Sequence, residues 1–156
     1  MMPGGDGLAK EPNGEKIMER CIFCKIAAGD IPATKVLEDE TCIAFMDIGP
    51  IAKGHVLLIP KAHYESLDDM PAGECGTMLK RLPALVRAVR NALDAEGVNV
   101  LQNNGKAAHQ EVMHVHFHVV PRWSGDAWKW NWPASTYPEG KMEELAGKIR
   151  SELDDR

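Results

Sequence analysis

The chain has 156 residues, of which 44% are hydrophobic, and this is enough apolar material for the core of one domain. A formal net charge of -5, without any dense run of lysine and arginine, argues against a nucleic-acid-binding surface. The longest apolar runs are far shorter than the roughly 20 residues that span a bilayer, so we expect no membrane segment.

The N-terminal region is rich in glycine and proline and carries few large side chains, which predicts a disordered tail over residues 1–20. It contains no apolar signal sequence, so we expect an unexported, cytoplasmic protein. The four cysteines are not expected to form disulfides in that compartment. Residues 21–156 are expected to form a single domain.

Three strands are predicted after the tail, over 35–39 (KVLED), 42–48 (CIAFMDI) and 54–61 (GHVLLIPK). Apolar residues recur at three- and four-residue steps from Glu74 to Ala95, which predicts a long amphipathic helix with a kink or a new start near Pro83. Two further strands, over 98–102 and 113–120, precede a short helix over 141–153. These elements predict an α+β fold, in which helices cover one face of a mostly antiparallel five-stranded sheet.

Three of the six histidines alternate with apolar residues in the segment VMHVHFHVVPR, residues 112–122. Successive side chains of a strand point to opposite faces, so His114, His116 and His118 would share one face and could surround one anionic group. Two other interpretations stay open on this pattern alone. The strand could be half-solvated with a polar face made of histidine, or a His-x-His pair and a third ligand could form the open zinc site of a hydrolase.

The run His-Val-His-Phe-His-Val-Val, residues 114–120, matches the histidine triad pattern, and the chain resembles the histidine triad (HIT) family of nucleotide-binding hydrolases. The resemblance covers about residues 21–122 and includes, in the family's order, CIFCKIAAGDIP, FMDIGPIAKGHVLLIPKAH and LQNNGKAAHQEVMHVHFHVVPR. It implies a HIT-like fold with its core over 21–122 and a C-terminal segment over 123–156. The length of the chain and the late NWP segment favour the phosphoramidase-like bacterial branch.

The resemblance also implies an enzyme that hydrolyses a purine nucleoside phosphoramidate or a related nucleotide conjugate. The central His116 would attack the α-phosphorus and form a nucleotidyl-histidine intermediate that water then hydrolyses, while its other ring nitrogen donates to the carbonyl of His114. His118 and His55 would donate to the phosphate oxygens, and Gln110 would lie near the leaving group. No catalytic metal is expected.

The same resemblance implies a nucleotide pocket. Asp47 would hold the ribose hydroxyls, because a carboxylate can accept two hydroxyl hydrogen bonds, and Asn103 would line the same pocket. Four hydrophobic residues would form an apolar slot for the purine: Ile22, Phe23, Phe45 and Ile48. The chain departs from the family at His109, where glycine is common, and at Glu111, where some members have serine or threonine.

Cys21 and Cys24 are spaced C-x2-C, which predicts either half of a metal site or a redox pair. A thioredoxin-like redox motif follows a strand, whereas a predicted tail precedes this pair. Some HIT proteins with this pair hold a structural zinc with two histidines, which the resemblance maps to His63 and His114. A redox pair and plain free thiols stay open as alternatives to zinc.

Four tryptophans lie close together after the triad, at Trp123, Trp128, Trp130 and Trp132. They would form an exposed apolar patch unless a second subunit or the core covers them. Because the C-terminal segment of the family crosses a partner subunit, we expect a homodimer.

Two alternative functions stay open beside the phosphoramidate hydrolase. One is a dinucleoside polyphosphate hydrolase, and the other is a non-catalytic regulator that binds purine nucleotides. The intact triad favours an enzyme, because a binding protein has no need of an oriented nucleophile.

Overall fold

The computed structural model describes residues 12–154, so residues 1–11 and 155–156 lie outside the description that follows. The helices of this part are α1 (Pro12–Arg20), α2 (Ile22–Ala28), α3 (Ala72–Leu79), α4 (Leu82–Ala92) and α5 (Lys141–Asp154). The strands are β1 (Lys35–Glu38), β2 (Cys42–Met46), β3 (Val56–Pro60), β4 (Gly97–Gln102) and β5 (Phe117–Arg122). Two short 3-10 turns, η1 (Leu67–Asp69) and η2 (Lys106–Ala108), complete it.

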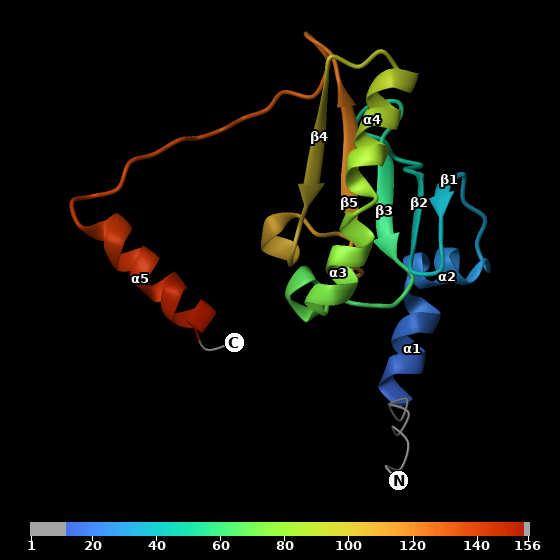
Figure 1. Ribbon diagram of the computed structural model, residues 1–156, viewed down its shortest axis with the longest axis horizontal. Coiled ribbons are helices and arrows are strands. Elements are labelled where there is room, and N and C mark those ends of the chain that lie inside the picture. Colours follow the sequence, from blue (N-terminus) through green and yellow to red (C-terminus); the bar gives the residue numbers. More distant parts are fainter. Residues whose placement is uncertain (1–11, 155–156) are drawn as a thin grey trace.

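The strands form one sheet in the order β1-β2-β3-β5-β4, and every neighbouring pair is antiparallel (Figure 1). This confirms the predicted α+β fold with a five-stranded antiparallel sheet. His118 of β5 lies opposite Leu57 of β3 on one side and Leu101 of β4 on the other. The last histidine of the triad is therefore fixed in the interior of the sheet.

The two faces of the sheet carry separate apolar clusters. Leu85 and Val89 of α4 pack on one face, with Ala44 and Leu58 among others. On the other face Phe23 and Ile26 of α2 pack against four strand residues, which are Ile43, Phe45, Leu57 and Ile59. Because α2 is held there by two buried side chains, helices lie on both faces, and the prediction that helices cover only one face is wrong.

The histidine segment keeps the predicted alternation of faces. The apolar residues between and after the histidines, Val115, Phe117 and Val119, all belong to the cluster under α4, so the histidines point to the α2 face. However, β5 begins only at Phe117, later than predicted. The backbone before Phe117 has a partner outside the strands, since the N–H of Val115 donates to the carbonyl of Tyr64 over 2.8 Å.

The predicted long helix is divided into α3 and α4 between Leu79 and Leu82. Pro83 lies in the first turn of α4, where the missing N–H of proline would have no intrahelical partner in any case. The expectation of a new start near Pro83 is confirmed, and a single continuous helix is not found.

The predicted tail over 1–20 needs correction in its second half. Residues 1–11 lie outside the described residues, but α1 forms a helix over Pro12–Arg20 whose side chains from Lys16 onward are exposed. The N–H of Cys21 donates to the carbonyl of Ile17 over 3.0 Å. A composition argument considers only burial, whereas the run EKIMER contains strong helix formers that satisfy their backbone groups locally.

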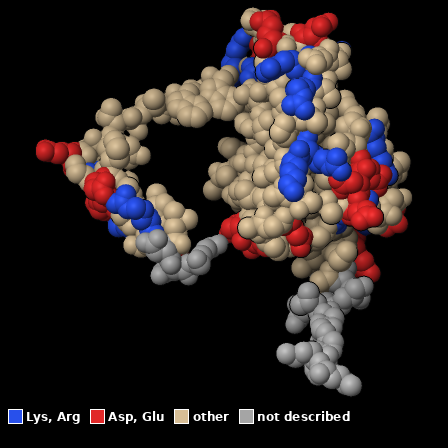
Figure 2. Space-filling model, in the orientation of Figure 1, with Lys and Arg blue, Asp and Glu red and all other residues tan. Residues whose placement is uncertain are grey.

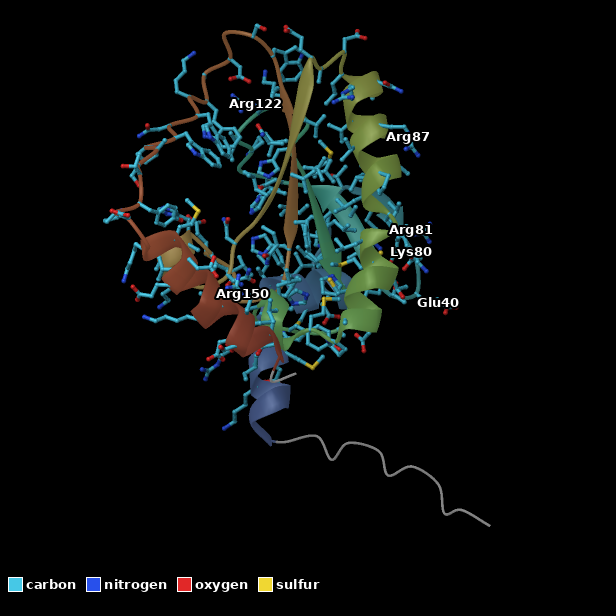
Figure 3. All side chains as sticks on the ribbon, turned by 60° about the vertical axis from the view of Figure 1, so that its left-hand side comes forward. Glu40, Lys80, Arg81, Arg87, Arg122 and Arg150 are labelled. Atoms are coloured by element: carbon cyan, nitrogen blue, oxygen red, sulfur yellow. The ribbon has the colours of Figure 1, made fainter. Side chains whose placement is uncertain are left out.

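Beyond β5 the chain first contacts the rest of the domain and then extends away from it. Arg122, at the end of β5 (Figure 3), binds both carboxylate oxygens of Asp126 over 2.7 and 2.8 Å and lies 4.5 Å from the ring centroid of Trp128. After that point an extended connection runs to α5, which stands apart from the sheet (Figure 1). Most of the connection carries no charge (Figure 2). No helix within residues 12–154 has the length and apolar content to cross a bilayer.

Candidate active site

A cavity of about 560 Å³ opens on the α2 face of the sheet. All six residues expected to bind the nucleotide line it, and these are Ile22, Phe23, Phe45, Asp47, Ile48 and Asn103. His55, His116 and His118 line it as well. The two phenylalanines are 7% and 4% exposed, so each is part of the core and part of the cavity wall. This volume is in the range of small-molecule sites.

His116 is oriented by the backbone two residues before it. Its Nδ1 lies 2.6 Å from the carbonyl oxygen of His114. A carbonyl can only accept, so Nδ1 carries the hydrogen and Nε2 of a neutral ring keeps a lone pair. The ring is 6% exposed and the edge of Phe23 packs against it at a centroid distance of 5.2 Å. His116 can therefore act as a nucleophile through the lone pair of Nε2.

His118 is oriented through a short chain of hydrogen bonds. The backbone N–H of Ile51 donates to Nδ1 of His55 over 3.2 Å, so the hydrogen of a neutral His55 is on Nε2. That nitrogen lies 2.9 Å from Nδ1 of His118 and donates to it. His118 must then carry its own hydrogen on Nε2, the remaining ring nitrogen. Burial lowers the pKa of both rings, and lowers that of His118 to about 4, which favours the neutral forms.

His55 is the middle member of this chain of hydrogen bonds. The ring lines the cavity but is only 2% exposed, and both of its nitrogens have partners inside the protein. These contacts fix the tautomer of His118.

Asp47 lies beside this chain at the cavity wall. One carboxylate oxygen accepts the N–H of Gly49 over 2.8 Å, and the other lies 3.6 Å from Nε2 of His55. Four lone-pair directions are available on a carboxylate, so these contacts leave it able to accept further hydrogen bonds.

Gln110 is not among the residues that line the cavity, and its side chain has partners in the backbone. The side chain is buried, and its Oε1 accepts the N–H of Gly105 over 2.7 Å. Its Nε2 donates to the carbonyls of Glu65 and Val112 over 2.6 and 3.0 Å. Because its amide binds three backbone groups, Gln110 fixes the conformation of the loop that precedes the triad.

Two residues of that loop face the cavity, although sequence reasoning gave them no role. His109 and Glu111 both line it, on either side of the buried Gln110. His109 has a φ of 64°, in the left-handed region, which explains why glycine suits this position. The signal that could have found them is their departure from the family at these positions.

The backbone amide of Ile51 was also missed. No side-chain pattern could have revealed it, because the group that acts on His55 is an N–H that every residue except proline carries.

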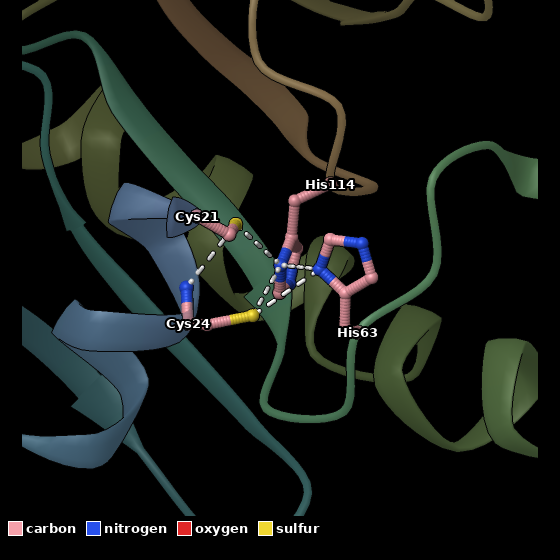
Figure 4. Close-up of side chains that lie close together, drawn as sticks. All are labelled: Cys21, Cys24, His63 and His114. Atoms are coloured by element: carbon pink, nitrogen blue, oxygen red, sulfur yellow. Dashed lines mark hydrogen bonds between the residues drawn. The ribbon is translucent and has the colours of Figure 1, made fainter. Parts of the chain in front are cut away.

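A second cluster lies next to the first histidine of the triad, where Cys21, Cys24, His63 and His114 converge (Figure 4). Nδ1 of His114 lies 3.5 Å from each sulfur, and Nδ1 of His63 lies 3.2 Å from the sulfur of Cys24 and 3.2 Å from Nδ1 of His114. All four residues that the resemblance mapped to a metal site are thus brought together.

The protonation of these groups suits metal binding. Nε2 of His114 donates to the carbonyl of Pro60 over 2.8 Å, so its Nδ1 presents a lone pair to the cluster. Burial lowers the pKa of His114 to about 4 and raises that of the Cys24 thiol to about 12. A buried thiol is hard to ionise without a cation, and a bound metal supplies the charge that stabilises the thiolate.

Comparison with known proteins agrees with this geometry. Residues 28–125 match the family model described as HIT domain. The chain is 40% identical over 134 residues to an adenosine 5'-monophosphoramidase of Schizosaccharomyces pombe, and the match covers 85% of this chain and 98% of that protein. A crystal structure of a HIT family member from Bacillus subtilis is similar with a TM-score of 0.81 and 38% identity, covering 85% of this chain and 96% of that one. A zinc-bound histidine triad family protein from Mycobacterium smegmatis is similar with a TM-score of 0.68 and 37% identity, covering 88% and 98%. The chain belongs to the HIT family.

Proposed function

We propose that this protein is a hydrolase that releases a purine nucleoside monophosphate from a phosphoramidate or a related conjugate, with His116 as the nucleophile. The observation that carries the proposal is the hydrogen bond from Nδ1 of His116 to the carbonyl of His114, because it leaves Nε2 free to attack. The similarity to a protein named adenosine 5'-monophosphoramidase supports the same reaction class.

The reaction would proceed in two displacements at the α-phosphorus. In the first, the lone pair of His116 Nε2 forms a P–N bond, and the bond from phosphorus to the leaving group breaks. The leaving amine takes up a proton from solvent and departs. In the second, water attacks the phosphorus, the bond to Nε2 breaks, and the nucleoside monophosphate leaves with the oxygen of that water while the proton goes to solvent or to the released ring.

His118 would stabilise the charge that develops on the phosphate oxygens. Its Nε2–H is the only ring group that the chain from Ile51 through His55 leaves free to donate. A donor whose orientation is fixed before the reaction costs no reorganisation in the transition state. We therefore assign His118 a catalytic role and His55 a positioning role.

The nucleoside would occupy the apolar side of the cavity. The ring of Phe23 and the side chain of Phe45 supply a wall on which a purine can pack, and Ile22 and Ile48 extend it. Asp47 would accept the ribose hydroxyls with the lone pairs that Gly49 leaves free. Asn103, at the end of β4, would complete the same wall.

We further propose that Cys21, Cys24, His63 and His114 hold a structural zinc ion. A tetrahedral site with Zn–S bonds of about 2.3 Å and Zn–N bonds of about 2.05 Å separates sulfur from nitrogen by about 3.5 Å and the two nitrogens by about 3.3 Å. The distances of 3.2 to 3.5 Å between the donor atoms fit this geometry. The metal would link α2 to the backbone that orients His116, since the His114 ring faces the cluster and its carbonyl faces the nucleophile.

We also propose a cytoplasmic homodimer. The helix α5 has an apolar stripe at Met142, Leu145, Ile149 and Leu153, and three of these residues are more than 60% exposed. Trp132 on the preceding connection is 72% exposed. Such a surface is stable in water when a second copy covers it. The four free cysteines suit a reducing compartment.

A turnover panel tests the reaction. Adenosine 5'-phosphoramidate should be hydrolysed to AMP with a higher kcat/KM than diadenosine triphosphate or tetraphosphate. The variant His116→Asn should lose turnover while it still binds AMP in calorimetry. Repeated turnover by the pure variant, or a clear preference for the dinucleoside polyphosphates, would overturn the proposal.

A further inference from the structure

The charges on the cavity wall are unusual for a site that takes a phosphorylated substrate. Asp47 and Glu111 carry carboxylates there, and no lysine or arginine is among the cavity-lining residues of the described chain. Two of the lining histidines, His55 and His118, have their pKa lowered by burial. The wall therefore offers no fixed positive charge to balance a highly anionic ligand.

Glu111 is held at this wall by its neighbours in the chain. Gln110, directly before it, is buried and binds three backbone groups, among them the carbonyl of Val112 directly after it. Val112 itself packs against the apolar cluster under α2. The backbone at Glu111 is thus fixed from both sides, and this exposed residue lines the cavity.

The carboxylate of Glu111 has no partner that would neutralise it. Within residues 12–154 it forms neither an ion pair nor a hydrogen bond, in contrast to Glu38, Glu96 and Glu144, which do. Its charge therefore acts on whatever occupies the cavity. The cube root of the cavity volume is about 8 Å, comparable to the Debye length at physiological ionic strength, so salt only partly screens this field within the site.

We propose that Glu111 selects the leaving group by charge, favouring leaving groups with an ammonium or other cationic centre and disfavouring polyphosphates. This inference rests on the proposed function, because it concerns the other half of the same substrate. A nucleoside phosphoramidate brings one negative charge to the site, whereas a dinucleoside polyphosphate brings several that no lysine or arginine of the wall offsets. A cationic amine on the leaving group gains an attraction that a neutral amine lacks.

The test compares two adenosine 5'-phosphoramidates whose amines have the same length, one ending in an ammonium group and the other in a methyl group. The wild-type protein should show a kcat/KM about fivefold higher for the ammonium substrate, since exposed charge pairs have effects of this size. In Glu111→Gln, which keeps the shape and removes the charge, the ratio should fall to about one. The wild-type preference should also shrink at high ionic strength.

A matched control is Glu40→Gln, which changes the net charge equally. Glu40 does not line this cavity and lies on the far side of the body from α5 (Figure 3), so the wild-type ratio should persist in it. Diadenosine triphosphate adds a third probe, whose kcat/KM should rise several-fold in Glu111→Gln and stay unchanged in Glu40→Gln. Equal ratios in the wild type and in Glu111→Gln would overturn the inference.

The two proposals fail in different ways. If the wild type hydrolyses plain adenosine phosphoramidate but does not distinguish the two amines, the role of Glu111 is refuted and the proposed function stands. If it hydrolyses no nucleotide, the proposed function fails, and binding of the two amides to His116→Asn by calorimetry still decides whether Glu111 distinguishes charge. Equal dissociation constants there would refute the selection as well.

Discussion

His116 donates from Nδ1 to the backbone carbonyl of His114 over 2.6 Å, while the ring of His114 turns the other way, toward two cysteines. One residue thus contributes its main chain to the candidate nucleophile and its side chain to the candidate metal site. The integrity of the second site should therefore affect the geometry of the first.

Removal of His55 should impair catalysis without large effects on nucleotide binding. In His55→Ala, His118 loses the donor that fixes its tautomer, and kcat should fall by about 100-fold while KM changes little. In His55→Gln the side-chain amide can still donate toward His118, so this variant should recover part of the loss. Nitrogen NMR of the His118 ring measures the tautomer directly.

A purely structural role for His55 would give a different pattern. Both variants would then lose activity in proportion to their loss of folded protein, and the His118 tautomer in the remaining folded fraction would be unchanged. That result would contradict the relay from Ile51 to His118.

The substitution Cys24→Ser should release zinc and destabilise the protein. Loss of a tightly held ion that binds only the folded state costs about 4 kcal/mol, which lowers Tm by roughly 10 °C for a chain of this size. Metal content by mass spectrometry and thermal unfolding measure the two effects. Cys75→Ser, outside the cluster, should keep the metal and most of the stability.

Chelation separates a structural ion from a catalytic one. The chelated protein that is still folded should hydrolyse phosphoramidate at a reduced but measurable rate per molecule. Activity that tracks bound zinc strictly, with the fold intact, would instead support a metal hydrolase.

The free energy of unfolding should decrease as the pH falls from about 6.5 to about 4, and His118 should account for part of the decrease. Burial first, and then the charges of His116 and His55, lower the pKa of its ring to about 4 in the folded state. The unfolded ring, with an ordinary pKa of about 6.5, binds its proton earlier, so acid favours unfolding in this range.

The contribution of His118 is isolated by comparison with His118→Gln. Above pH 6.5 the difference in the free energy of unfolding between the wild type and His118→Gln should be constant. Between pH 6.5 and 4 the free energy of unfolding of the wild type should fall by on the order of 2 kcal/mol more than that of the variant. This is a smaller fall than a fully buried ring would cause. Denaturant unfolding at several pH values measures this. Parallel curves for the two proteins would contradict the neutral buried ring.

The apolar stripe of α5 should carry the contact between two copies of the chain. Ile149→Lys places a charge in the middle of this stripe and should shift sedimentation from dimer toward monomer at micromolar protein. Ser151→Lys adds the same charge on the opposite side of the helix and should leave the dimer intact. A wild-type protein that sediments as a monomer would refute the proposed homodimer.

The sequence was informative where a pattern along the chain determines the direction of side chains. Alternation of histidines with valine and phenylalanine placed the triad opposite the core under α4, and C-x2-C spacing marked half of the cysteine–histidine cluster. The five strands followed from runs of β-branched and aromatic residues.

Other features depend on backbone partners that are distant in the chain. Gln110 turns inward because the carbonyl of Glu65, far away in sequence, accepts from it, and no local pattern encodes that contact. The tautomer of His118 depends on the backbone amide of Ile51 acting through His55. The α1 helix was missed because composition does not show that it runs directly into α2, a helix that is packed on the sheet.

The central claim is that Nε2 of His116 itself forms a bond to phosphorus. The most direct measurement is mass spectrometry of peptides from the protein quenched in acid-free conditions during turnover of adenosine 5'-phosphoramidate. We predict one AMP group attached to the His116 ring in the wild type and none in His116→Asn. An active enzyme that never carries the nucleotide on His116, under conditions where a synthetic phosphohistidine survives the same workup, would contradict the account.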